Sequence, residues 1–117
     1  MTALIIENAG YFRERNKEMN QMKWIEQIRV RSSVSALQDA MPSLHKRVKE
    51  IDISARGAEV FFMQHALYQG DLAIVLVWIN ETKPRKTHEG MMVAERLLQL
   101  GPIDHAVWIP AENMPGV

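Results

Sequence analysis

The stretch from residue 58 to residue 78, AEVFFMQHALYQGDLAIVLVW, decides the fold. In a strand over its first nine residues, even-numbered and odd-numbered side chains would point to opposite faces of a sheet, and this alternation predicts a strand over 58–66. Residues 72–78 are apolar on both faces, which is typical of an inner strand that is buried on both sides. Between them, Tyr68-Gln69-Gly70-Asp71 predicts an antiparallel hairpin. We expect its Gln69-Gly70-Asp71 segment to adopt the positive φ that a tight turn requires.

One strand and one helix precede this hairpin. Residues 23–31 predict a strand by alternation, with Trp24, Glu26, Ile28 and Val30 on one face and Ile25, Gln27, Arg29 and Arg31 on the other. Ser32-Ser33 supplies a helix N-cap, and apolar residues at spacings of three and four predict a helix over 34–51. Because Pro42 interrupts that helix, we expect a kink or break near Ala40 and Met41.

A second helix and a fourth strand follow the hairpin. Residues 80–86 form a polar connection, and Thr87 is the expected N-cap of a helix over 89–100. Gly90 weakens the first turn of that helix, and Gly101-Pro102 ends it. Residues 104–109 predict the last strand.

The order strand–helix–strand–strand–helix–strand is the split βαβ pattern of the ferredoxin-like α+β fold. We expect a four-stranded antiparallel sheet in the order 4-1-3-2, and a single domain over residues 23–117. Residues 1–22 show no clean period and are expected to be an N-terminal extension, irregular apart from a short helix near Tyr11 to Met19. Met19 or Met22 could instead be the natural start, which would make the extension a start-codon artefact.

Composition narrows the class of protein. The 14 basic and 14 acidic side chains cancel, so no global field favours nucleic acid or an anionic membrane, and we expect neither as a partner. The chain has no cysteine, which excludes disulfides, thiolate metal sites and cysteine nucleophiles. The longest apolar run, residues 72–79, is too short to span a bilayer, and residues 1–6 lack a basic start. We therefore expect a cytoplasmic protein.

Alternation divides the sheet into two faces. Bulky residues such as Ile28, Val30, Phe62 and Leu76 suit the face beneath two helices. The other face is too apolar for a fully solvated one, and carries Gln27, Arg29, Phe61, Met63, His65, Ala73, Val75 and Val77. We expect a homodimer in which two such faces meet and form a dimeric α/β barrel with helices outside. A ligand pocket between the sheets and a filled core, with Arg29 paired to an acidic group, are both compatible with this pattern.

Two residues of that face are candidates for catalysis. Arg29 could stabilise an anion, and His65 could move a proton, or could be a hydrogen-bonded interface histidine. The candidates for lining the pocket are Gln27, Phe61, Met63, Trp78 and Trp108, where a tryptophan near a strand end could wall the pocket or pack in the core. The four histidines have no metal-ligand spacing, and no P-loop, GxGxxG or Ser-His-Asp order occurs, so we expect no metal site.

The chain resembles the antibiotic biosynthesis monooxygenase-like group of the dimeric α/β-barrel superfamily. The resemblance rests on the order of elements, the strand ending Leu76-Val77-Trp78, and His88 ten positions later, early in the second helix. It covers residues 23–109. That group includes cofactor-independent oxygenases of aromatic substrates, haem-degrading enzymes and members with no demonstrated activity.

The resemblance implies two alternative functions. One is a small cofactor-independent monooxygenase-like enzyme that acts on a small apolar or aromatic substrate. The other is a non-catalytic dimeric ligand-binding or interaction module. Haem degradation in this superfamily needs a histidine at the mouth of an apolar pocket, but Lys86 and Glu89 beside His88 indicate a solvated turn. We therefore expect no haem and no other cofactor.

Overall fold

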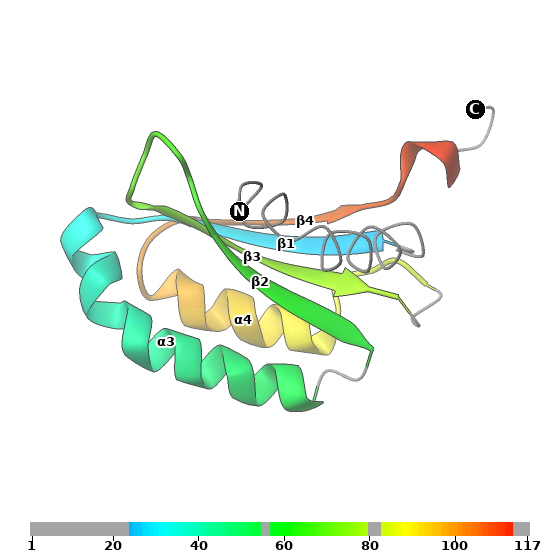
Figure 1. Ribbon diagram of the computed structural model, residues 1–117, viewed down its shortest axis with the longest axis horizontal. Helices are drawn as coiled ribbons and strands as arrows, with labels where there is room; N and C mark the ends of the chain where they lie inside the picture. Colours follow the sequence, from blue (N-terminus) through cyan, green and yellow to red (C-terminus); the bar gives the residue numbers. More distant parts are fainter. Residues whose placement is uncertain (1–23, 55–56, 80–82, 114–117) are drawn as a thin grey trace, which may run out of the picture.

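The computed structural model describes residues 24–54, 57–79 and 83–113, and these form an antiparallel sheet with two helices on one face (Figure 1). The elements are β1 (Trp24–Arg31), α3 (Val34–Ser54), β2 (Ala58–Gln64), β3 (Asp71–Trp78), α4 (His88–Leu98), β4 (Ile103–Trp108) and the 3₁₀ turn η1 (Ala111–Asn113). The strand order β2-β3-β1-β4 confirms the predicted topology and the ferredoxin-like α+β class. The predicted extension over 1–22, with its short helix, lies outside the described residues.

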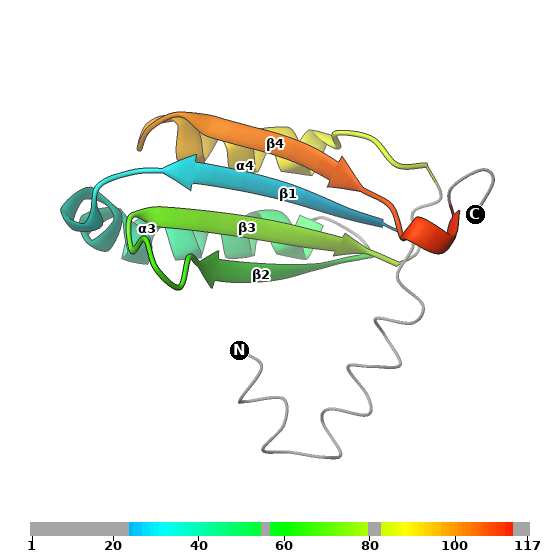
Figure 2. The ribbon, with the colours of Figure 1, turned by 90° about the horizontal axis from the view of Figure 1, so that it is seen from above.

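The apolar phase of each strand faces the helices, as predicted. Ile28 of β1 lies opposite Ile74 of β3, and both side chains are fully buried. In Figure 2, both helices lie behind the sheet; α4 packs on β1 and β4, and α3 packs on β2. The buried core consists of Trp24, Ile28, Val30, Leu37, Leu44, Val48, Ile51, Leu72, Ile74, Leu76, Trp78, Val93, Ala94 and Leu97.

The predicted turn over residues 68–71 is present, because the Asp71 amide donates to the Tyr68 carbonyl at 2.9 Å, but the strand end and the backbone of Gly70 differ from the prediction. Strand β2 ends at Gln64, two residues early, and among the described residues only Gly57 and Gly101 have a positive φ, so the prediction for Gly70 was wrong. Gly70 is required for another reason: a Cβ there would lie 2.1 Å from the carbonyl oxygen of Ser32. The Ser32 amide donates to the Gly70 carbonyl at 2.9 Å. The hairpin therefore closes against the end of β1.

Helix α3 is continuous through Pro42, so the alternative of a break was wrong. Its first turns lie at an angle to the rest of the helix in Figure 1, which agrees with the predicted kink. The cause is the proline ring, which removes one backbone donor and clashes with the preceding turn. Ser33 caps the helix as expected, since its Oγ accepts from the Ala36 amide at 3.1 Å. None of the helices that the structure describes is long and apolar enough to cross a membrane.

Candidate functional site

The sheet face turned away from the helices, here called the open face, carries a hollow of about 420 Å³. Strands β1, β2 and β3 and the start of the hairpin connection line it. Apart from Gln64 and Leu72, the lining residues belong to the phase of each strand that points to this side. The lining residues are Ile25, Gln27, Arg29, Met63, Gln64, His65, Asp71, Leu72, Ala73 and Val75. The hollow thus contains both predicted catalytic residues, Arg29 and His65.

Arg29 supplies the positive charge of the hollow. Its register partner on β3 is Ala73, whose small side chain leaves room beside the guanidinium. Its register partner on β4 is the exposed Asp104, but among the described residues Arg29 has no ion pair and no side-chain hydrogen bond. An acidic partner for Arg29, the alternative to an anion-binding role, is therefore not found within the described part of the chain. A half-buried arginine without a partner can accept an anion in bidentate geometry.

His65 helps to form the hairpin connection. Its Nδ1 accepts hydrogen bonds from the amides of Leu67 and Tyr68, at 3.0 and 3.1 Å, and its ring contacts the Tyr68 ring. An Nδ1 that accepts leaves the proton of the neutral ring on Nε2. Nε2 can therefore donate a hydrogen bond to a ligand, whereas neither nitrogen is free to act as a base while the turn stays closed.

Only some of the residues predicted to line a pocket lie at the hollow of the open face. Gln27 and Met63 line the hollow, and Phe61 lies on the same face without lining it. Trp108, opposite Ile25, is 56% exposed. Trp78 belongs to the other face, where its ring stacks on Trp24 with the centroids 5.6 Å apart. Assigning Trp78 to the same pocket as Arg29 was therefore wrong, because strand alternation separates the two residues by the thickness of the sheet.

A polar cluster beneath α4, centred on Glu26, was not predicted. Oε1 of Glu26 accepts hydrogen bonds from Trp78 Nε1 at 3.1 Å and from Thr87 Oγ1 at 2.7 Å. Oε2 accepts from the Thr87 amide at 3.0 Å and lies 2.6 Å from His105 Nε2. The Glu26 side chain is fully buried, and that of His105 is 8% exposed. These partners stabilise a carboxylate that burial alone would make very costly.

The Glu26 cluster fixes the beginning of α4. Thr87 is the N-cap, as predicted, and its Oγ1 also accepts from the Gly90 amide at 2.9 Å. A Cβ on Gly90 would lie 1.7 Å from Oε2 of Glu26, so this glycine lets the helix approach the carboxylate. With two donors on each oxygen, the carboxylate has little capacity left for a substrate. We therefore interpret the cluster as an anchor for the helix.

His88, the first residue of α4, is exposed. Within residues 24–54, 57–79 and 83–113, no group of three histidine, aspartate or glutamate side chains gathers in a way that could hold a metal ion.

No family model matches this chain, and searches of curated proteins and of solved structures likewise find no match. Membership of the monooxygenase-like group therefore stays a prediction that rests on the sequence pattern.

Proposed function

We propose that this protein binds a small, largely apolar ligand in the hollow of the open face, and that the ligand carries a negative charge or a hydroxyl that can lose its proton. The observation that carries the proposal is the half-buried Arg29, which has no partner among the described residues and lies beside the apolar side chains of Ile25, Met63 and Val75. A hollow of about 420 Å³ lies within the usual range for small-molecule sites. The apolar walls would hold the body of the ligand, and Arg29 would orient its anionic group.

We further propose that the protein works as a homodimer through the open face. Met63 is 40% exposed and Trp108 is 56% exposed on this side, and neither helix covers it. A second copy would bury these side chains and close the hollow. Exclusion of water would also strengthen the interaction between Arg29 and an anion. The cytoplasmic location stays a prediction made from the sequence.

The reaction we propose is a cofactor-independent oxygenation of the monooxygenase-like kind. Arg29 would favour the anionic form of a phenol-like substrate, which is the form that gives up electrons to dioxygen. In the balanced reaction, a phenol and dioxygen give a quinone and water. One oxygen atom enters the ring, the other leaves as water, and the substrate is oxidised while dioxygen is reduced. The protein supplies orientation and a dry cavity.

The second candidate is a non-catalytic ligand-binding module, and the hydrogen bonds of His65 favour it. Because Nδ1 of His65 accepts two amide hydrogen bonds, this histidine is not available as the base that removes the substrate proton. Binding requires Arg29 and the apolar walls alone. The two candidates therefore share a site and differ in whether dioxygen is consumed.

Calorimetric titration with 1-naphthoate and 1-naphthol tests the site. We expect saturable binding, and a loss of naphthoate affinity of about tenfold or more in Arg29→Gln, since a hydrogen bond to a charged group contributes about 1.5–3 kcal/mol. The control is Arg85→Gln, which removes an exposed arginine outside the hollow and should change affinity less than about twofold. Absence of binding, or an equal loss in both variants, would contradict the proposal. Oxygen uptake with 1-naphthol then separates the enzyme from the module.

A further inference from the structure

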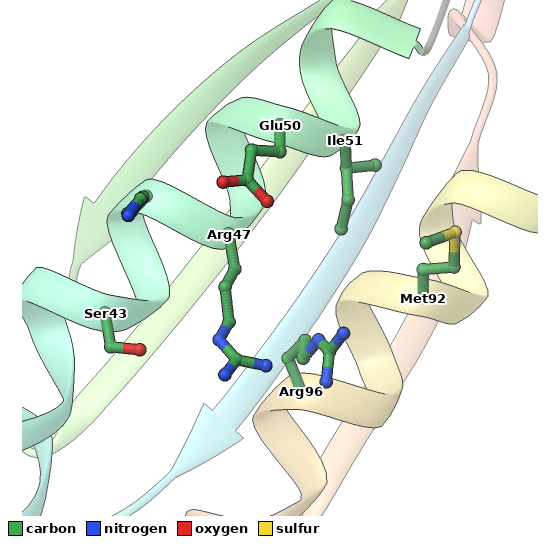
Figure 3. A pocket seen from close by; sticks show the side chains of 7 residues that line it. Ser43, Arg47, Glu50, Ile51, Met92 and Arg96 are labelled. Carbon is green, nitrogen blue, oxygen red and sulfur yellow. The ribbon is translucent and has the colours of Figure 1, made fainter.

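The outer side of the helix layer has a groove between α3 and α4, on the opposite side of the sheet from the open face. Two adjoining hollows of about 410 and 420 Å³ form it, and both are lined by Ser43, Arg47 and Arg96. Figure 3 shows Arg47 extending from α3 across the space between the helices, in the direction of Arg96 on α4. The groove therefore brings two guanidinium groups together from elements that are far apart in the sequence.

The charge of this groove is strongly positive. Lys46, Arg47 and Arg96 line it, and Glu50 is the one carboxylate among its lining residues, so the formal sum is 3 − 1 = +2. Within the described part of the chain, neither Arg47 nor Arg96 has an ion-pair or hydrogen-bond partner for its guanidinium. Two facing cations repel each other unless an anion lies between them. A doubly charged anion would neutralise the groove.

The floor of the groove is apolar. Ile51 and Met92 line one hollow, and Leu44 and Leu100 line the other. Leu44 and Ile51 belong to the core and are each 6% exposed, so the floor is a fixed surface. The two arginines lie where the hollows adjoin, so an anion bound by them would have apolar surface on either side.

We propose that this groove binds the phosphate group of a small organic phosphate ester, with the apolar part of the ester against the floor. A phosphate monoester carries a charge of about −1.5 to −2 at pH 7. This charge matches the formal charge of the groove better than that of a singly charged carboxylate does. Its oxygens accept the paired N–H groups of two guanidiniums, and the Ser43 hydroxyl can donate to a further oxygen. The site is independent of the hollow around Arg29 because the sheet separates the two.

Calorimetric titrations with phenyl phosphate, inorganic phosphate and benzoate, in a buffer free of phosphate, test the charge and the floor separately. Phenyl phosphate should bind saturably, at least tenfold more tightly than benzoate and at least fivefold more tightly than inorganic phosphate. Arginine Nε–Hε resonances of Arg47 and Arg96 should shift during the titration. No saturable binding, or equal affinities for phenyl phosphate and benzoate, would overturn the proposal.

Substitutions locate the site. Arg96→Gln and Arg47→Gln should each weaken the binding of phenyl phosphate at least tenfold. Lys49→Gln is the matched control, because it removes one positive charge from an exposed position of α3 that does not line the groove; it should weaken binding less than twofold. An equal loss of affinity in Lys49→Gln would overturn the proposed site, because it would show that the overall positive charge of the protein attracts the phosphate. Arg47 is exposed, so its variant stays informative if Arg96→Gln folds poorly.

Discussion

Replacing Glu26 by Gln changes the buried cluster beneath α4 while it keeps the shape of the side chain. The amide nitrogen must take the place of one carboxylate oxygen. In place of Oε1 it faces the indole N–H of Trp78, which can only donate; in place of Oε2 it faces the backbone N–H of Thr87. Thr87 Oγ1 and His105 can reorient, but these two N–H groups cannot. Either orientation therefore leaves one buried donor facing another.

The cost of this change follows from the number of bonds that are altered. One unsatisfied buried donor costs about 1–3 kcal/mol, and the bonds that remain lose the extra strength that a charged acceptor gives. A hydrogen bond to a charged group contributes about 1.5–3 kcal/mol, and the change weakens several such bonds at once. We expect Glu26→Gln to lower the free energy of unfolding by about 3–5 kcal/mol. For a domain of this size, this corresponds to a fall in Tm of roughly 12 °C or more.

Urea unfolding at pH 7, followed by tryptophan fluorescence, measures this loss because Trp24 and Trp78 both lie in the core. All variants should be compared at one protein concentration, since association adds to the apparent stability of a dimer. The control is Glu95→Gln, the same chemical change at an exposed position of α4, which should cost less than about 0.5 kcal/mol. A loss below about 1 kcal/mol in Glu26→Gln would refute the anchoring role.

Three further outcomes are expected. Gly90→Ala should destabilise the protein by about 1–3 kcal/mol in the same assay, because its Cβ would collide with the Glu26 carboxylate. Helix propensity alone predicts that the same substitution stabilises the protein by about 1 kcal/mol, so a rise in the free energy of unfolding would contradict the close contact. Met63→Glu should convert a dimer into a monomer by sedimentation at micromolar concentration, whereas Leu67→Glu, at a position 79% exposed beyond the end of β2, should not. A wild-type monomer would contradict the proposed interface. Titration with haemin should give no Soret shift, and a shift that disappears in His88→Ala would show that expectation to be wrong.

The strands and the two faces of the sheet could be predicted from the sequence because their signal is local. Alternation along β1 places Ile28 and Val30 in the core, and the structure buries both completely. The N-caps Ser33 and Thr87 could also be predicted, since a capping hydroxyl bonds an amide three residues away. These features depend only on neighbours along the chain.

The Glu26 cluster could not be predicted in the same way, because its partners Trp78, Thr87 and His105 lie 52 to 79 residues away in the chain. One signal was present: Glu26 lies in the apolar phase of its strand, and a carboxylate in that phase must find donors. The role of Gly70 was hidden for a similar reason. Its close neighbour is the backbone of Ser32, which only the folded chain brings near.

Strand β1 carries a charged residue with a different role on each face of the sheet, Glu26 on the helix side and Arg29 on the open face. It is paired on both sides, so the side chains of its charged residues project from one face of the sheet or the other. Glu26 points to the helices and receives two donors on each oxygen, which leaves nothing for a ligand. Arg29, three residues later, points to the open face and has no partner within the described part of the chain. The N–H donors of the half-buried Arg29 guanidinium have no acceptor within the described residues, so an anion on the open face would find them available. For that reason we propose ligand binding at Arg29 and interpret Glu26 as the anchor of α4.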